Sequence, residues 1–340
     1  PLEQRTDVIY YPYSLLSVNI HQMAQPADLP PLIGQSAAFL ALSEEISRLA
    51  TLDRSVLVIG ERGTGKELVA ARLHFLSPRW DGPYAKLNCA ALAEGLLESE
   101  LFGHEAGAFT GATRRRAGRF ELANSGSLFL DEIANATMSV QEKILRTVEY
   151  GEFERVGGNA TIGVDVRVIG ATNIDLPSAA AAGRFRHDLL DRLSAAVVTI
   201  PPLRARIEDI LLLANHFGRA LAQEVGWTAF PGFSRSALKA LRSYRWPGNV
   251  RELKNAIERG LALHQGGEQL EPQDLGLSAP SSPIGGASTR GQGSLAELER
   301  EAIRAALAAH PTLTAAARAL GIDRRTLRRR MKRHGVVRGE

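Results

Sequence analysis

A glycine-rich stretch, GERGTGKE, has the residue types and the spacing that bind phosphate. Gly60, Gly65 and Lys66 fit the pattern G-x-x-x-x-G-K, directly after an apolar run at 55–60 and before a helical pattern. Glycines let successive backbone N–H groups wrap a phosphate, and the helix N-terminus and the lysine add positive charge. The strand–loop–helix context argues against a chance glycine turn. We therefore predict that the phosphates of a nucleotide bind to this loop: Gly60, Glu61, Arg62, Gly63, Thr64, Gly65, Lys66 and Glu67.

A pair of carboxylates, Asp131 and Glu132, ends the apolar run SLFLDE. At the end of a buried strand, the first carboxylate could bind Mg²⁺ and the second could orient the attacking water; a solvated strand end is the alternative for Glu132. Glu67 stands where a P-loop usually carries a Ser or Thr hydroxyl for the metal, so its direct ligation of Mg²⁺ stays open. Thr172 and Asn173 end another apolar run and could hydrogen-bond the γ-phosphate or the water, with a plain turn as the alternative.

Two arginines, Arg186 and Arg192, lie in GRFRHDLLDRL, which predicts a helix. Their spacing keeps them off one narrow stripe of that helix. An arginine that a neighbouring subunit supplies can stabilise the negative charge of a phosphoryl-transfer transition state. For either residue taken singly, ordinary surface charge is an open alternative.

Three apolar, β-branched runs, at 55–60, 126–132 and 164–173, alternate with helical patterns. Such runs are typical of parallel strands that are buried on both faces. After about Pro202 the pattern becomes helical. We therefore predict an α/β fold with a parallel sheet and helices, then a small helical lid and a C-terminal all-α module. The expected boundaries are 1–30 for an N-terminal extension, 31–202 for the ATPase core, 203–275 for the lid, 276–294 for a flexible linker and 295–340 for the DNA-binding module.

The overall composition is that of a globular protein, with 44% hydrophobic and 23% charged residues. No run reaches the roughly 18 apolar residues of a membrane span, so we expect no membrane insertion. Cys89 is the single cysteine, which excludes an internal disulfide and favours a reducing cytoplasm. The chain does not begin with Met, and Met23 would make a sensible start, so residues 1–22 are expected to be non-native. The linker prediction rests on 278–294, where eleven of seventeen residues are Gly, Ser or Pro.

The C-terminal segment 321–340 carries eight Lys and Arg residues against two acidic ones. The sequence LTAAARALGIDRRTLRRRMKRHG has the form of a helix–turn–helix, with Gly321 at the turn and small residues at 315–317 that permit a close helix crossing. The expected core stripe is Ala319, Leu320, Ile322, Leu327 and Met331. A basic solvated helix is the alternative. The arginines left for a groove of double-stranded DNA are Arg324, Arg325, Arg328 and Arg329.

The stretch HEAGAFTGAT at 104–113 offers one ring and one hydroxyl among small residues. Its glycines disfavour a helix interior, where each costs about 1 kcal/mol relative to Ala. The segment also has too little bulk to build a core. On these residues alone, a surface turn with a buried Phe109 is as acceptable as a mobile tip that presents Phe109 and Thr110.

Taken together, five motifs resemble the AAA+ activators of sigma-54 RNA polymerase: GERGTGKE, ESELFGHEAGAFTGA, GSLFLDE, FRHDLLDRL and YRWPGNVREL. The resemblance covers roughly residues 31–275, the terminal helical module fits it, and GAFTGA is highly specific to this family. It implies an AAA+ ATPase that uses ATP and Mg²⁺, binds upstream DNA and assembles as a hexameric ring. Such a ring remodels closed complexes of sigma-54 polymerase to open complexes. Glu67 is usual in this family.

The resemblance also implies residue roles at the ATP site. Lys66 contacts the phosphates, Asp131 holds Mg²⁺, Glu132 polarises water, and Asn88 holds that glutamate until ATP is read. Further roles fall on Arg186 and Arg192 as fingers that act on a neighbour's ATP, and on Arg251 as a lid residue that senses nucleotide. The loop that presses on the sigma factor comprises Gly107, Ala108, Phe109, Thr110, Gly111 and Ala112. Glu121 could communicate nucleotide state to this loop, with a helix-face charge as the alternative.

Within the family, we expect no receiver or sensor domain, and the chain is most similar to the phage-shock activators. That similarity implies a separate inhibitor protein that binds the ATPase domain. Trp80, in the loop context LSPRWDG, is the expected inhibitor contact; a Trp that covers its own domain is the alternative.

Two other classes of protein remain as alternatives. An AAA+ unfoldase or DNA motor also uses a mobile aromatic loop, but such loops typically carry aromatic–hydrophobic–Gly triplets and no helix–turn–helix follows. A DNA-binding repressor with a degenerate ATPase is disfavoured by intact Lys66, Asp131 and Glu132.

Overall fold

The structure, a computed structural model, describes residues 31–224, 226–227, 229–263, 269–277, 307, 312–319, 327–328 and 331. The expected extension at 1–30 and most of the expected linker lie outside the described residues. The chain divides into two compact units, 1–279 and 280–340, which are described separately below.

The first unit is built on a parallel sheet with the strand order β2-β3-β6-β1-β7. The strands are β1 (Val56–Ile59), β2 (Tyr84–Asn88), β3 (Ser127–Asp131), β6 (Arg167–Thr172) and β7 (Ala196–Thr199). β1, β3 and β6 lie within the three apolar runs, while the sequence did not single out β2 or β7. Because all pairings are parallel, the carboxyl ends of the strands meet at one edge, where ligands of open α/β sheets bind.

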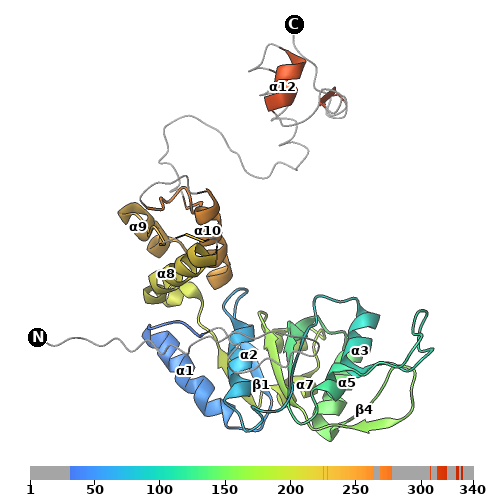
Figure 1. The fold of residues 1–340 in the computed structure, drawn as a ribbon. Helices are drawn as coiled ribbons and strands as arrows, with labels where there is room; N and C mark the ends of the chain where they lie inside the picture. The colour runs from blue at the N-terminus through green and yellow to red at the C-terminus, as the bar shows by residue number, and fades with distance from the viewer. Residues whose placement is uncertain are drawn as a thin grey trace, which may run out of the picture. The chain divides into compact units, whose positions relative to one another are not determined.

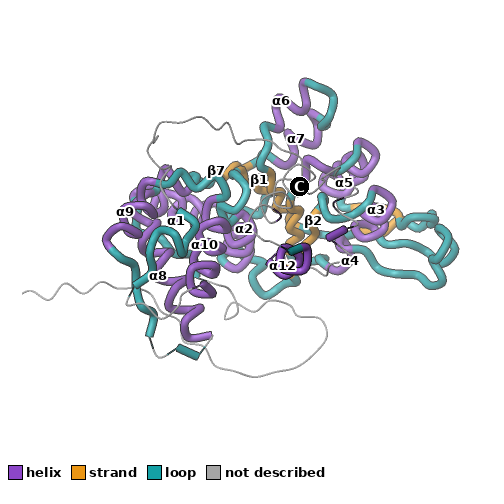
Figure 2. Tube along the Cα trace, turned by 90° about the horizontal axis from the view of Figure 1, so that it is seen from above, coloured by secondary structure: helices purple, strands orange, loops and turns teal. Residues whose placement is uncertain are grey.

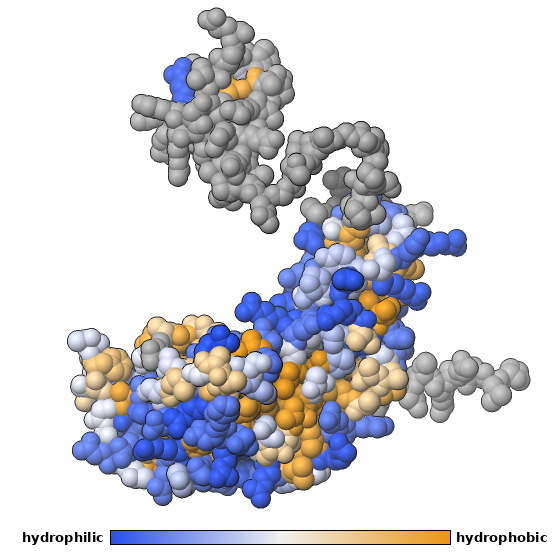
Figure 3. Space-filling view, turned by 180° about the vertical axis from the view of Figure 1, so that it is seen from behind, coloured by the Kyte–Doolittle hydropathy of each residue, from blue (hydrophilic) through white to orange (hydrophobic). Residues whose placement is uncertain are grey.

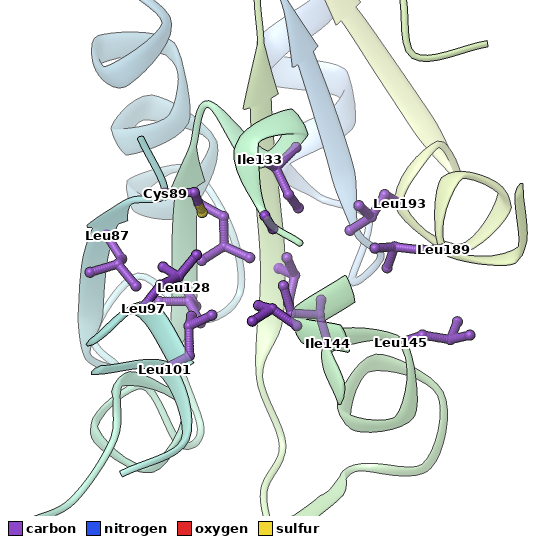
Figure 4. Close-up of a cluster of buried hydrophobic side chains, with 14 of the residues drawn as sticks. Leu87, Cys89, Leu97, Leu101, Leu128, Ile133, Ile144, Leu145, Leu189 and Leu193 are labelled. Carbon is purple, nitrogen blue, oxygen red and sulfur yellow. The ribbon is translucent and has the colours of Figure 1, made fainter. Parts of the chain in front are cut away.

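Each face of the sheet has its own apolar core, because successive strand residues point to opposite faces. Phe129 packs in the cluster that includes helices α1 (Ala37–Ala50) and α2 (Lys66–Phe75). Leu128 and Leu130 pack in the other cluster, part of which is drawn in Figure 4. That second cluster draws on α3 (Glu94–Phe102), α4 (Arg119–Leu122), α5 (Met138–Tyr150), α6 (Leu176–Ala181) and α7 (His187–Leu193).

Two insertions leave this layered core. One is the segment between α3 and α4, which contains GAFTGA; the other is an antiparallel hairpin of β4 (Glu152–Glu154) and β5 (Thr161–Gly163). A short 3₁₀ turn, η2 (Ile133–Asn135), follows β3. Figure 1 shows the segment between α3 and α4 at the edge of the domain beside β4, on the opposite side from α1.

The lid begins with a 3₁₀ turn, η3 (Leu203–Ala205), and continues as α8 (Ile207–Glu224), α9 (Arg235–Ser243) and α10 (Asn249–Leu263). Its core centres on the fully buried Trp246, whose indole N–H donates to the Leu241 carbonyl at 2.9 Å. Figure 2 shows the helices of the lid gathered on the α1 side of the sheet. The predicted parallel sheet with a helical lid is therefore confirmed.

In the second unit, the structure describes helix α12 (Leu313–Ala319) and a small apolar cluster. Ala316, Ala317, Leu307 and Leu327 are buried there, and Met331 packs against them. Leu327 and Met331 thus lie in the core as predicted, whereas Leu320 and Ile322 lie outside the described residues. Over the part of the chain that is described, no helix is long and apolar enough to cross a membrane.

Candidate nucleotide site and partner-contact loop

The predicted phosphate-binding loop joins β1 to α2. Gly63 and Gly65 have φ angles of +77° and +101°, in the left-handed region that favours glycine. A Cβ on Gly63 would lie 2.2 Å from the Gly248 carbonyl oxygen of the lid, so this position has no room for a side chain. Lys66 begins α2, is only 8% exposed, and its Nζ donates to the Gly60 carbonyl at 3.1 Å.

The loop also keeps backbone donors available. Among the described residues, the N–H groups of Arg62, Gly63 and Gly65 donate no hydrogen bond to the protein. Buried or partly buried N–H groups need an acceptor, and those at a helix N-terminus suit an anion. The loop geometry therefore fits a phosphate group.

The carboxylate pair lies beside this lysine. Glu132 Oε1 is 3.6 Å from Lys66 Nζ, and the backbone N–H of Glu132 donates to Asp131 Oδ1 at 3.0 Å. Glu132 has a φ of +51°, a left-handed conformation that is unusual outside glycine and is often found at functional sites. Burial, and then the neighbouring charge of Glu132, raise the pKa of Asp131. The site thus concentrates negative charge that a cation would relieve.

In this structure Asn88 contacts Asp131, whereas the expected role of Asn88 concerns Glu132. The register of β2 and β3 sets Asn88 directly opposite Asp131, and Asn88 Nδ2 donates to Asp131 Oδ2 at 3.1 Å. The left-handed backbone of Glu132 turns its carboxylate toward Lys66 instead. A switch of Asn88 to Glu132 with nucleotide state stays a prediction.

Glu67 lies in the first turn of α2 with a 61% exposed side chain, and its Oε1 accepts from Lys86 Nζ at 2.7 Å. Its charge nevertheless contributes to the raised pKa of Asp131, so the two carboxylates lie within electrostatic range. Within the described ranges, no group of three or more His, Cys, Asp or Glu residues is arranged to hold a metal ion. A Mg²⁺ ion at Asp131 would therefore need phosphate and water oxygens to complete its shell, as is usual for this ion.

Thr172 and Asn173 lie at the end of β6, next to β1. Ile59 is in register with Thr172, and the Gly60 N–H donates to the Thr172 carbonyl at 3.1 Å. Thr172 is fully buried and its Oγ1 accepts from the Ile174 N–H at 3.2 Å, so its hydroxyl supports the local turn. Asn173 is partly exposed at the same edge.

The lid contacts the phosphate-binding loop through the first residues of α10. The N–H groups of Val250 and Arg251 donate to the Gly63 carbonyl at 3.0 and 3.3 Å. This brings the predicted nucleotide sensor, Arg251, to the loop, and its side chain is exposed. The residue just before them, Asn249, was not among the predicted site residues; it is fully buried and bonds to the loop. The signal was present in GNVREL, because Asn tolerates the left-handed conformation found there.

The two predicted finger arginines lie beside α5. Helix α7 begins one residue after Arg186, so this residue is the N-cap and is not in the helix as expected. Arg186 Nη2 pairs with Asp188 Oδ2 at 2.8 Å, and its Nη1 is 3.6 Å from Glu142 Oε2. Arg192 pairs with Glu149, and its side chain is 55% exposed. Arg186 is thus partly exposed and Arg192 exposed, and the ion pairs of both are with acidic residues other than Asp131 and Glu132.

The GAFTGA segment forms an open tip. Phe109 is 41% exposed and its ring meets that of His104 edge-on at 5.0 Å, so Phe109 is not a buried core residue. Thr110 is exposed. Gly107 and Gly111 have φ angles of +83° and +104°, and nothing lies within 4 Å of a Cβ built on either. They are required by backbone conformation and not by crowding.

Backbone hydrogen bonds close the same tip. The Gly107 N–H donates to the Ala112 carbonyl at 2.7 Å, and the Ala112 N–H donates to the Phe109 carbonyl at 3.0 Å. Ala112 is 7% exposed and Ala108 is partly buried. The tip therefore has a defined turn, on which Phe109 and Thr110 are exposed.

The base of this loop is held by a buried arginine. Arg155 on the β4–β5 connection is 7% exposed and donates to Glu105 Oε1 and to Glu121 Oε1, each at 2.9 Å. The Val156 N–H donates to the Gly103 carbonyl and the Glu105 N–H donates to the Val156 carbonyl, both at 3.0 Å. Glu121 thus reaches the loop base through Arg155, while its signalling role stays a prediction.

Two further predicted contacts lie apart from the ATP site. Trp80 is 54% exposed in the loop between α2 and β2, where its backbone N–H donates to the Ser77 carbonyl at 3.2 Å. Its side chain is thus about half-buried, and its role as an inhibitor contact stays a prediction. Of the four groove arginines, Arg328 is described and exposed; Arg324, Arg325 and Arg329 lie outside the described residues.

A parallel sheet, a phosphate-binding loop, a strand that ends in two carboxylates and a helical lid on that loop together define a P-loop ATPase of the AAA+ class. Residues 32–199 match the Sigma-54 interaction domain family, residues 204–284 match the AAA+ ATPase lid domain family, and residues 294–334 match the bacterial regulatory protein, Fis family.

Curated and solved relatives agree. The chain is 58% identical over 233 residues to the Psp operon transcriptional activator of Escherichia coli, which covers 68% of this chain and 72% of the relative. It is 48% identical to the transcriptional regulatory protein ZraR of Salmonella typhi, over 89% of this chain and 68% of the relative. A crystal structure of NtrX from Brucella abortus in complex with ATP aligns with a TM-score of 0.69 and 33% identity, over 90% of this chain and 70% of that one.

The chain belongs to the family of sigma-54-dependent AAA+ transcriptional activators that bind DNA through a Fis-type helix–turn–helix. Its first unit is an ATPase, and its partners are the sigma-54 polymerase and DNA.

Proposed function

We propose that this chain assembles as a hexameric ring that couples ATP hydrolysis to the conversion of sigma-54 closed complexes to open complexes. The observation that carries the proposal is the exposed tip at 107–112, built on a hydrogen-bonded base and placed apart from the ATP site. A tip with one exposed ring and freely accommodated glycines suits contact with another protein.

At the ATP site, the chain's own residues bind and orient. Lys66 would hold the terminal phosphates, Asp131 would hold Mg²⁺, and Glu132 would orient the attacking water. Bound Mg²⁺ supplies a positive charge that offsets negative charge on the phosphates as they react. The raised pKa of Asp131 and the proximity of Glu132 to Lys66 support this assignment.

The ring would bring Arg186 and Arg192 to the ATP of a neighbouring subunit. Both are surface residues whose ion pairs are with acidic residues of their own subunit, so they could exchange partners at an interface. Figure 3 shows apolar residues gathered in a band on the back of the ATPase unit, a surface that contact with a second copy would bury. Arginine fingers are worth about 10³ to 10⁵ in rate in known GTPases.

The helix–turn–helix would deliver this ring to DNA upstream of the promoter. Arg324, Arg325, Arg328 and Arg329 would contact the groove and phosphates, which makes binding steeply dependent on salt. A regulator that acts on chromosomal DNA works in the cytoplasm.

Control would come from a separate inhibitor protein that binds the ATPase unit. The support is Trp80, whose side chain is more than half exposed in a short loop. Exposed Trp residues are common anchors of protein interfaces, where truncation can cost about 2 kcal/mol or more.

The experiment that tests the proposal is open-complex formation with sigma-54 polymerase and hydrolysable ATP. We expect Phe109→Ala and Thr110→Ala to retain most of the ATPase rate while open-complex formation fails, because the tip contacts the partner and not the nucleotide. Tyr150→Ala, which removes a 69% exposed ring elsewhere on the unit, is the matched control and should retain both activities. Loss of ATPase and open-complex formation together in Phe109→Ala would contradict the proposal.

A further inference from the structure

Asn249 has an unusual place at the junction of core and lid. It opens α10 with a φ of +52° and is completely buried. A buried polar side chain is retained at such a position only when its hydrogen bonds are satisfied.

The side-chain amide of Asn249 makes three hydrogen bonds. Its Oδ1 accepts from the Leu203 N–H at 2.8 Å, and its Nδ2 donates to the Arg62 carbonyl at 3.0 Å and to Glu61 Oε2 at 3.1 Å. An N–H on one side and two oxygens on the other leave a single orientation of the amide. Asn249 therefore joins three segments that are far apart in the sequence: the phosphate-binding loop, the core–lid connection η3 and the lid helix α10.

Glu61 strengthens the same junction. Its carboxylate is paired with Arg204 of η3 through both oxygens. Arg204, and then Asn249, hold the pKa of Glu61 down to about 2, below its ordinary 4.5. A carboxyl group whose pKa is lowered in the folded state stabilises the fold at a pH above its ordinary pKa. This stabilisation is lost as the pH falls toward the lowered pKa. The junction is thus fully ionised at neutral pH.

We propose that Asn249 is a positioning residue of the ATPase: it seats the start of α10 on the phosphate-binding loop and so presents Arg251 to the nucleotide. The Val250 and Arg251 N–H groups donate to the Gly63 carbonyl directly after it, so displacement of Asn249 displaces both the loop and the sensor. The inference rests on the proposed nucleotide roles of Lys66 and Arg251.

The first test is Asn249→Asp in the full chain. The new carboxylate still accepts from the Leu203 N–H, but it loses both donor bonds and faces the carboxylate of Glu61. We expect the Kd for ADP and the KM for ATP to rise about tenfold or more, because two partly buried oxygens of the loop lose the Asn249 donor and the new carboxylate faces that of Glu61. Asn215→Asp is the matched control: the amide of Asn215 donates to the Leu211 carbonyl within α8, and nucleotide affinity should stay unchanged.

The second test is rescue with a reversed pair. In Asn249→Asp/Glu61→Gln, the amide at position 61 can donate to the carboxylate at 249, so affinity should return toward that of Glu61→Gln alone. If Asn249→Asp changes only the thermal stability, with Kd, KM and kcat unchanged, the positioning role is overturned. Failure of the double variant to regain any affinity would also overturn it.

Lys66→Ala in the same ADP-binding assay separates this inference from the proposed function. If Lys66→Ala abolishes binding while Asn249→Asp leaves it unchanged, the inference alone fails. If neither variant changes binding, the nucleotide site itself is wrong and both fail.

Discussion

The nucleotide edge of the sheet and the GAFTGA tip belong to one unit and are built in opposite ways. At the nucleotide edge, Lys66 is 8% exposed and a Cβ on Gly63 would meet the lid backbone at 2.2 Å. At the tip, Phe109 is 41% exposed and the flanking Gly107 and Gly111 have open space around them. Chemistry on a phosphate requires donors that are already in place, whereas contact with a partner requires an exposed surface. Glycine is used in both regions for different reasons. At the nucleotide edge it lets the lid backbone approach the loop closely, and at the tip it allows the left-handed backbone conformation.

The largest effect is expected at the nucleotide edge, where a substitution should abolish most of the nucleotide affinity. Lys66→Ala removes the buried ammonium group of the loop, and we expect the Kd for ATP to rise by at least about 30-fold, as for loss of a buried charged partner. Equilibrium binding of a fluorescent nucleotide measures it. Lys143→Ala, which removes a lysine paired with Glu98 on the far side of the core, is the control. Wild-type affinity in Lys66→Ala would show that the loop does not bind phosphate.

The next largest effect concerns Arg192, which we expect to act at the nucleotide edge of a neighbouring subunit. Mixtures of Lys66→Ala and Arg192→Ala subunits should regain part of the ATPase rate, because some interfaces unite an intact loop with an intact arginine. The measurement is ATPase rate against mixing ratio, with mixed assemblies verified by crosslinking of tagged subunits. If the verified mixtures never exceed either parent, Arg192 does not act across subunits.

A smaller effect concerns the packing at the C-terminal end of α2, away from the phosphate-binding loop at its start. His74 of α2 is buried, its Nδ1 lies 3.0 Å from Ser127 Oγ, and burial lowers its pKa from 6.5 to about 4. The unfolded chain therefore takes up this proton first, and stability should fall as the pH drops from 6.5 to 4.

The melting temperature measured between pH 7 and pH 4 tests this expectation, with each kcal/mol worth about 2–4 °C. His74→Gln should flatten the decline but not abolish it, because burial also lowers the pKa of His216. An unchanged pH profile in His74→Gln would exclude His74 as the acid-sensitive group.

The smallest effect on the fold is expected at the exposed surface. Trp80→Ala should leave the ATPase rate and melting temperature near those of the wild type, because the side chain is more than half exposed, while it weakens binding of the inhibitor protein. Leu96→Ala, at a side chain of similar exposure on α3, is the matched control. A lower melting temperature with unchanged inhibitor affinity would assign Trp80 to the fold.

Most of the nucleotide site could be predicted from the sequence, because its parts are local. A strand, a glycine loop and a helix start follow one another at 56–75, and Asp131 and Glu132 are neighbours at the end of β3. The GAFTGA segment was equally local, although its residues alone left open whether Phe109 is buried. The carboxylate that Asn88 contacts in this structure, Asp131, could not be predicted locally, because the register of two strands sets Asn88 opposite it.

The sequence by itself thus determined the strand–loop–helix units, the lid and the chemistry that their side chains carry, since these depend on residues close together in the chain. Only the tertiary structure decided which distant residues meet. Asn249 and Glu61 are 188 positions apart, and Arg155 reaches Glu105 and Glu121 from a separate hairpin. Such pairs carry no local periodicity or spacing, because their contact depends on how whole elements pack. Hydrogen bonds join the lid to the phosphate-binding loop, and others join the base of the GAFTGA segment to the β4–β5 hairpin. Both sets form only after the sheet and its helices have assembled.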